Sequence, residues 1–247
     1  MSRQDFDFRA ITRYLFGHVT TLQTILFVAP VLLFSVIAHE YAHGYAALRQ
    51  GDSTALMLGR LTWNPLKHID LWMTIIMPFI LLKTMGVALG GAKPVPVNPR
   101  NYRNFKRGDI IVSLAGIAIN FLLAFLCAGA IVLFGLLARA LPVTEPSVGI
   151  LQVMMVLGIQ LNLALVLFNL LPIPPLDGSH VFKYLLPPAW SLQYQRLGFL
   201  GLIAIVVLIK VAPGFLDWWF GPADYLSRTL RFGVRDLLTP AYFSWVS

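Results

Sequence analysis

The chain has 247 residues, of which 57% are hydrophobic and 12% are charged, and its formal net charge is +8. Soluble domains carry about a quarter charged residues, so this composition, with a mean hydropathy of +0.73, excludes an ordinary soluble domain. The basic residues are spread through loops between apolar runs, which is typical of a polytopic membrane protein contacting the lipid bilayer. The positive charge therefore gives no indication of nucleic-acid binding.

The apolar runs, taken in chain order, predict an all-α polytopic fold. Residues 1–21 predict an interfacial segment rather than a removable signal peptide. Four runs approach the roughly 20 residues that a helix needs to cross a bilayer, at about 22–47, 110–137, 150–171 and 197–216. A weaker run, 71–90, is interrupted by proline, lysine and glycine and predicts a re-entrant or interfacial element. We therefore expect four to five transmembrane helices.

These elements predict one membrane-embedded domain over 1–247, with the N-terminal segment 1–21, a core at 22–181 and a C-terminal helix with an aromatic and basic tail at 182–247.

Two loops are rich in turn formers. The loop 58–70 predicts an extended strand followed by an Asn-Pro turn, and 90–109 carries three prolines within six residues and is therefore extended. A third proline-rich stretch, 169–180, ends the run at 150–171.

The sequence His39-Glu40-Tyr41-Ala42-His43 is an H-E-x-x-H motif at the end of the first run. On a helix, positions i and i+4 share one face, so both imidazoles can reach one ion. Zinc accepts neutral imidazole nitrogens, and a neighbouring glutamate can take a proton from water. Charged residues inside a membrane helix are costly, so an unused motif of this kind is rare. The motif predicts a catalytic zinc ion.

A third protein ligand is needed, and the aspartates are its candidates. Asp177 follows the proline-rich end of the run at 150–171 and has an apolar approach, whereas the other aspartates lie near the first loop, at the start of the run at 110–137 or in the C-terminal tail. Elimination favours Asp177 as a ligand, and the alternative is an ordinary residue of an Asx turn.

The segments "AHEYAHGYAA" and "FNLLPIPPLDGSH" together resemble the site-2 protease family of intramembrane zinc metalloproteases, and "GGAKPVPVNPRN" and "SLAGIAINFLLA" look like segments of its compact bacterial members without a PDZ domain. The resemblance covers 36–181. It implies one Zn2+ per chain held by His39, His43 and Asp177, with Glu40 as the catalytic base. It also implies that Asn169 helps to hold the scissile peptide, the alternative being a helix-end cap.

One departure from the family pattern is visible. The chain has Ala115-Gly116-Ile117 where the family often has Ala-Gly-Pro, so the helix around Gly116 is expected to start straighter. The predicted metal ligands are unaffected by this difference.

The shared ion restricts the topology. The end of the first run and the end of the run at 150–171 must lie on one side of the membrane, which requires 71–90 not to cross. That side then carries eleven of the nineteen lysines and arginines, and the positive-inside rule places it in the cytoplasm. The resemblance implies a multi-pass protein of the bacterial inner membrane.

The expected reaction is hydrolysis of a peptide bond in or next to the transmembrane segment of a protein or peptide substrate. Because such a segment must first unwind, "MLGRLTW" (57–63) or "AKPVPV" (92–97) is a candidate edge strand for it, the alternative being a plain surface loop. The substrate-binding candidates are Gly59, Leu61, Pro94 and Val95.

Two other polar residues were considered. His68 could orient a substrate, or it is an interfacial histidine without catalytic duty. Asn120 predicts an interhelical hydrogen bond. The rival functions are a metal-ion transporter and a catalytically inactive membrane scaffold, and the sequence assigns no oligomeric state.

Overall fold

The computed structural model describes residues 21–77, 79–80, 91–198 and 200–246. Within these ranges the regular elements are helices and no strand occurs. Three helices are long and apolar enough to cross a membrane: α2 (Thr21–Gln50), α5 (Phe105–Ala140) and α6 (Glu145–Leu170). They confirm three of the four predicted runs.

Two predictions fall mainly outside the described residues. These are the interfacial N-terminal segment, of which 1–20 are not described, and the re-entrant element at 71–90, of which 78 and 81–90 are not described. The described start of the latter is a π-helix, Leu71–Ile76, capped by the Asp70 carboxylate, which accepts hydrogen bonds from Trp72 and Met73. Whether this element crosses the membrane stays a prediction.

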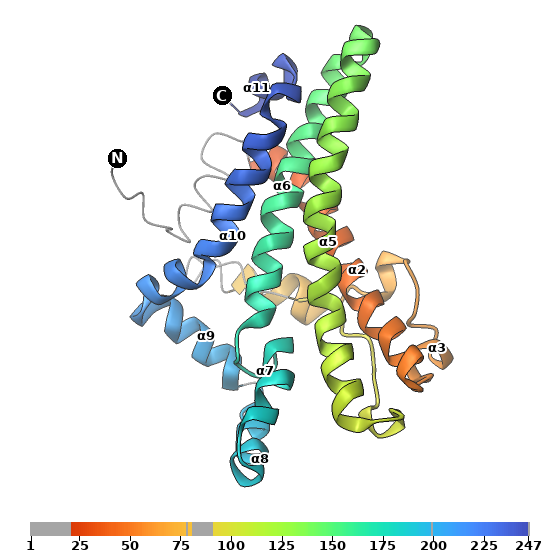
Figure 1. Cartoon of the computed structure of the whole chain (residues 1–247), viewed down its shortest axis with the longest axis vertical. Coiled ribbons are helices and arrows are strands. Elements are labelled where there is room, and N and C mark those ends of the chain that lie inside the picture. The colour runs from red at the N-terminus through yellow and green to blue at the C-terminus, as the bar shows by residue number, and fades with distance from the viewer. Residues whose placement is uncertain (1–20, 78, 81–90, 199, 247) are drawn as a thin grey trace. The chain divides into compact units, whose positions relative to one another are not determined.

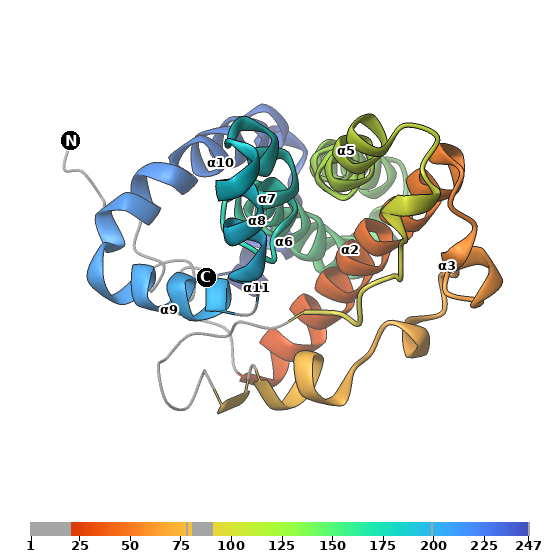
Figure 2. The ribbon, with the colours of Figure 1, turned by 90° about the horizontal axis from the view of Figure 1, so that it is seen from below.

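The chain divides into two compact units, Leu33–Ile119 and Met1–Leu32 with Asn120–Ser247. In the first unit, α2 is followed by α3 (Thr54–Met57), a 3-10 turn at Pro65–Lys67, an extended segment that leads into the 3-10 turn Pro99–Asn101, and the start of α5. The extended segment, residues 91–98, runs along α2 (Figure 2). The small apolar core of this unit consists of Ala47, Tyr102 and Val112.

The extended strand predicted for 58–64 is not formed. Helix α3 instead ends at Met57 and is followed by a turn at Gly59, whose φ is +62°; the N–H groups of Gly59 and Arg60 donate back to the Leu56 and Ala55 carbonyls. Glycine adopts this left-handed conformation without the steric cost of a Cβ atom. A local helix end therefore replaces the predicted strand.

The second unit contains the rest of α5, α6, α7 (Asp177–Phe182), α8 (Pro188–Arg196), α9 (Leu200–Val211), α10 (Pro213–Val234) and α11 (Pro240–Val246), with 3-10 turns at Pro142–Thr144, Lys183–Leu185 and Arg235–Leu237. Helix α10 runs beside α6 (Figure 1). Their shared core contains residues of α5, α6 and α10: Ala124, Ala128, Ile131, Val156, Ile159, Leu163, Ala223 and Val234.

Buried polar side chains fix these helices against one another. The Asn120 amide donates to the Asn162 side-chain oxygen at 2.8 Å, which confirms the predicted interhelical hydrogen bond. Gln152, fully buried, donates to the Leu237 carbonyl and accepts from the Thr239 N–H. Each bond satisfies a polar group that burial would otherwise penalise.

The fourth predicted run, 197–216, is not one continuous helix. Helix α9 ends at Val211, and a proline begins α10 two residues later. Proline is favoured at the first position of a helix but cannot continue one. The prediction of a single span there was wrong because the apolar run conceals this helix boundary.

Candidate metal centre

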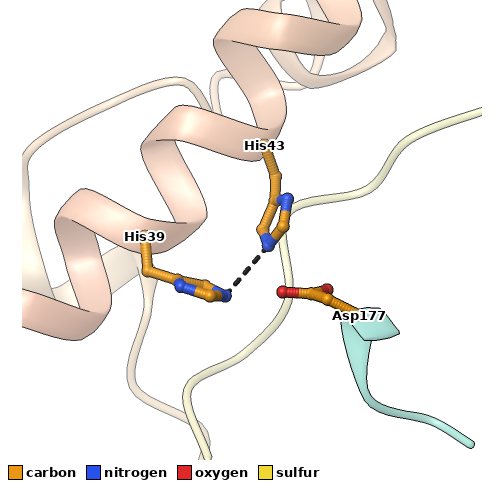
Figure 3. Close-up of side chains that lie close together, drawn as sticks. All are labelled: His39, His43 and Asp177. Carbon is orange, nitrogen blue, oxygen red and sulfur yellow. Dashed lines mark hydrogen bonds between the residues drawn. The ribbon is translucent and has the colours of Figure 1, made fainter. Parts of the chain in front are cut away.

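His39 and His43 lie on successive turns of α2, and their imidazoles point toward each other (Figure 3). The two Nε2 atoms are 2.9 Å apart, and the His39 side chain is buried. Two nitrogens that bind the same tetrahedral zinc ion at 2.0–2.1 Å are about 3.3 Å apart. A small opening of the pair is therefore enough to admit an ion.

A hydrogen bond sets the protonation of His43. Its Nδ1 lies 2.7 Å from the Val112 carbonyl oxygen on α5. Because a carbonyl oxygen only accepts, Nδ1 carries the ring proton, and the neutral imidazole presents its lone pair at Nε2. Metal-binding histidines are commonly oriented by such a bond on the second ring nitrogen. The donor chemistry of this pair fits a zinc ion.

Gly116 on α5 leaves the space in which the two ligand nitrogens meet. A Cβ atom at this position would lie 2.5 Å from His43 Nε2 and 2.7 Å from His39 Nε2. Contacts below 3.0 Å are essentially never seen for real Cβ atoms. The position therefore requires glycine, because any side chain would enter the space where an ion must bind.

Glu40 is held by the main chain of the extended segment. Its Oε2 accepts a hydrogen bond from the Val95 N–H at 2.7 Å. Glu40 follows His39 on the helix and is rotated by about 100° from it, so its carboxylate approaches the extended segment. Its Oε1 can accept a hydrogen bond from a second donor.

Asp177 and Asn169 lie in the second unit, at the two ends of the proline-rich loop. Asp177 is the first residue of α7. A Cβ atom on Gly178 would lie 2.3 Å from the Leu170 carbonyl oxygen, so glycine allows α7 to begin against the last turn of α6. The Asn169 amide donates to the Leu165 carbonyl at 3.0 Å within α6. The donor set His39, His43 and Asp177 could hold a metal ion.

Two of the substrate-binding candidates approach the same residue of α2, Gly44. The side chains of Leu61 and Val95 both approach Gly44, at 3.1 and 2.9 Å from where its Cβ would be. Pro94 contributes its carbonyl to a hydrogen bond from Arg60. Gly59 lies in the turn that follows α3 and is exposed. Leu61 and the buried Val95 therefore pack against the same glycine, whereas Gly59 has a conformational role of its own.

His68 is buried, with 1% of its surface exposed, and its Nε2 lies 2.8 Å from the Thr62 carbonyl oxygen. Its own carbonyl accepts from the Lys93 N–H at 2.8 Å. The residue links the loop 58–70 to the extended segment. These bonds give His68 a structural duty in the interior of the unit.

Sequence reasoning missed the parts played by Gly44, Gly116 and Asp52. Gly44 directly follows the H-E-x-x-H motif and Gly116 lies within "SLAGIAINFLLA", but the role of each glycine depends on which other segments pass close to it. Asp52 was grouped with the loop aspartates. It follows Gly51 at the end of α2, and the "QGD" sequence was a usable signal of a helix end.

Comparison with known proteins places the chain in a family. Residues 27–152 and 142–209 match the family model of peptidase family M50. "Putative zinc metalloprotease YwhC" of Bacillus subtilis is 37% identical over 188 residues, which are 76% of this chain and 82% of the relative. "Putative zinc metalloprotease Rip2" of Mycolicibacterium smegmatis is 33% identical over 76% of this chain and 68% of its own length.

The protein of the same name from Mycobacterium tuberculosis is 29% identical over 78% of this chain and 70% of its own length. No solved structure matches significantly. The chain belongs to peptidase family M50, the site-2 protease family, and it is a zinc metalloprotease with candidate membrane-spanning helices.

Proposed function

We propose that this protein is an intramembrane protease, which hydrolyses peptide bonds in or next to the transmembrane segments of membrane proteins. The observation that carries the proposal is the His39–His43 pair. Its Nε2 atoms meet beside Gly116, and the bond from Nδ1 to Val112 leaves His43 ready to bind a metal. The three candidate membrane-spanning helices include the helix that carries this pair.

We propose one zinc ion per chain, held by His39, His43 and Asp177. Asp177 supplies a carboxylate, which completes a set of three protein ligands and leaves a position open for chemistry, as in catalytic zinc sites. The assignment requires the ends of α2 and α6 to lie on one side of the membrane. If 71–90 does not cross, the ends of α2 and α6 lie on the same side, and Asp177 follows the end of α6.

The bound ion would lower the pKa of water and polarise the scissile carbonyl. Glu40 accepts the proton of the attacking water and delivers it to the departing amine. The Val95 N–H holds one oxygen of this carboxylate, and the other oxygen can accept the proton. Asn169 uses one amide hydrogen within α6, and its second amide hydrogen can donate to the scissile carbonyl.

The unwound substrate lies against Leu61, whose half-buried side chain approaches Gly44 next to His43. Main-chain pairing along 92–97 is limited, because the N–H groups of Lys93 and Val95 already donate to His68 and Glu40. Side-chain contacts with Leu61, rather than a long ladder of hydrogen bonds, hold the substrate.

We place this active-site end of α2 on the cytoplasmic side of a bacterial inner membrane, with 71–90 re-entrant. The experiment is a map of tag accessibility at residues 60, 105 and 141. The proposal expects 60 and 105 on the cytoplasmic side and 141 on the other side. Residues 60 and 105 on opposite sides would refute the re-entrant assignment.

Replacement of Glu40 by glutamine tests the reaction itself. The glutamine cannot accept the proton, so we expect zinc content to stay at wild-type level while cleavage falls by about 10²- to 10⁴-fold. Uncleaved substrates then accumulate in cells and can be identified by mass spectrometry of the membrane fraction. The chain's other glutamate supplies the matched control: Glu145→Gln should leave cleavage unchanged.

The rival functions predict other results. A metal transporter keeps moving metal after Glu40→Gln, and an inactive scaffold shows no change in the cleavage of any membrane protein. Equal membrane proteomes in wild-type and Glu40→Gln cells would therefore contradict the proposed function.

A further inference from the structure

Asp52 is a fully buried carboxylate that the proposed reaction does not use. It follows Gly51, whose φ of +113° ends α2 in the left-handed region. The N–H groups of Gly51 and Asp52 donate to the Leu48 and Ala47 carbonyls, which is the pattern of a Schellman helix end. This turn directs the Asp52 side chain into the unit instead of into solvent.

The two carboxylate oxygens of Asp52 have different partners. Oδ1 accepts from the Thr54 N–H, the Thr54 hydroxyl and the Asn101 amide. Oδ2 accepts from the main-chain N–H of Asn98 at 2.6 Å. The side chain thus joins the end of α2 to the end of the extended segment.

Residues 93–98, here called the strap, carry that connection to Glu40. Of the four residues in the strap that have an N–H group, three donate to other parts of the unit: Lys93 to the His68 carbonyl, Val95 to Glu40 and Asn98 to Asp52. The remaining two residues are prolines, which fix φ and stiffen the chain.

The two ends of the strap are held independently. At the first end, Arg60 Nη2 donates to the Lys93 and Pro94 carbonyls at 3.0 and 3.3 Å. At the last end, the Asn98 N–H donates to Asp52, and the Asn98 carbonyl accepts from the Asn101 N–H at 3.0 Å. Val95 lies between these anchors and is buried, so its N–H direction depends on both.

We propose that Asp52 is a positioning residue for Glu40, acting through the strap. Asp52 fixes Asn98, the strap transmits this constraint over three residues, and the Val95 N–H then holds the Glu40 carboxylate at 2.7 Å. The inference rests on the proposed function of Glu40 as the base. A carboxylate displaced by even 1 Å can cost about 10²-fold in rate.

The charge state of Asp52 agrees with this role. Burial raises its pKa, but hydrogen bonds from Asn98, Thr54 and Asn101 outweigh burial, and the pKa lies below its ordinary value of 3.8. The side chain is therefore an acceptor at both oxygens throughout the neutral range.

Hydrogen exchange of the purified full-length protein tests the connection without any substrate. Asp52→Asn replaces one acceptor oxygen by an NH2 group, so donors now face a donor. We expect the Val95 and Asn98 amides to exchange about 10-fold faster, the equivalent of one net hydrogen bond. The Lys93 amide, held by His68, should change little, and zinc content should stay at wild-type level.

Thr54→Val is the matched control, because it removes one donor to Oδ1 and keeps the bond from Asn98 to Oδ2. It should leave Val95 exchange unchanged. If Asp52→Asn does not fold, Asp52→Glu keeps the charge but displaces the carboxylate, and it should accelerate the same two amides. Unchanged Val95 exchange in the folded Asp52 variant, or equal acceleration at Lys93, would overturn the inference.

A kinetic measurement separates this inference from the proposed function. With a substrate identified by trapping in Glu40→Gln cells, Asp52→Asn should lower kcat by about 10-fold and leave KM unchanged. A fall in zinc content or a rise in KM alone would indicate a general structural role and contradict positioning. The proposed function fails instead if Glu40→Gln retains wild-type cleavage, regardless of the hydrogen-exchange rate of the Val95 amide.

Discussion

Gly116→Ala should remove zinc from an otherwise intact protein. The added Cβ would lie 2.5 Å from His43 Nε2 and 2.6 Å from His39 Cε1. Ordinary contacts of a Cβ atom begin at 3.4 Å, so the His43 nitrogen would have to move by about 0.9 Å. Zinc-ligand distances tolerate deviations of about 0.2 Å. At least one imidazole therefore leaves the position from which it can bind.

The magnitude follows from this displacement. Disturbing the orientation of metal ligands typically costs about 10- to 100-fold in affinity, and the clash here acts on both imidazoles. The same substitution favours the helix itself by about 0.5–1 kcal/mol, because alanine has a higher helix propensity than glycine. Loss of metal should therefore occur without loss of helix.

The assay is a competition titration of zinc against a chromophoric chelator in detergent, with circular dichroism to verify the helix content. The control is Gly129→Ala on the same helix, where a Cβ would meet no atom within 4 Å. We expect the control to bind zinc like wild type. Wild-type affinity in Gly116→Ala would refute the assignment of the metal to the space beside this glycine.

Three further experiments test other parts of the structure. Gln152→Leu leaves the Leu237 carbonyl and Thr239 N–H without their partner, so the free energy of unfolding should fall by about 1–3 kcal/mol. Proteolysis within 235–246 should also accelerate, and an unchanged cleavage rate would contradict the anchoring role. A double-mutant cycle of Asn120→Ala and Asn162→Ala, followed by unfolding in detergent, should give a coupling of about 0.6 kcal/mol; zero coupling would argue against their hydrogen bond. Because hydrogen bonds depress the pKa of Asp52 in the folded state, its carboxylate stabilises the fold fully above the unfolded pKa of about 3.9 and loses this effect as the pH falls through the folded pKa. The stability difference between wild type and Asp52→Asn should be constant above about pH 5 and shrink below about pH 4, and a difference independent of pH over that range would exclude the carboxylate as its source.

The parts of the site that sequence predicts well are local. His39 and His43 share a face because the helix repeat fixes the relation between i and i+4, and this relation needs no knowledge of the rest of the fold. The long apolar helices are equally local, since a single run of apolar residues determines each. Three of the four apolar runs were predicted correctly on this basis.

The parts that sequence did not predict depend on contacts between distant segments. Gly116 was noted only as the neighbour of a missing proline, and its importance comes from the imidazoles of another helix. Asp52 was placed only with the aspartates next to the first loop, because two of its partners, Asn98 and Asn101, lie 46 and 49 residues further along the chain. The strand expected at 58–64 failed because a short extended run needs a paired neighbour, and a turn at Gly59 follows a helix there instead.

X-ray absorption at the zinc edge of the purified wild-type protein tests the central claim most directly. We predict one zinc per chain, with two imidazole nitrogens and oxygen ligands at about 2.0–2.2 Å, and loss of the imidazole scattering when both His39 and His43 are replaced by alanine. A protein without stoichiometric zinc, or a zinc spectrum that the double replacement leaves unchanged, would contradict the account.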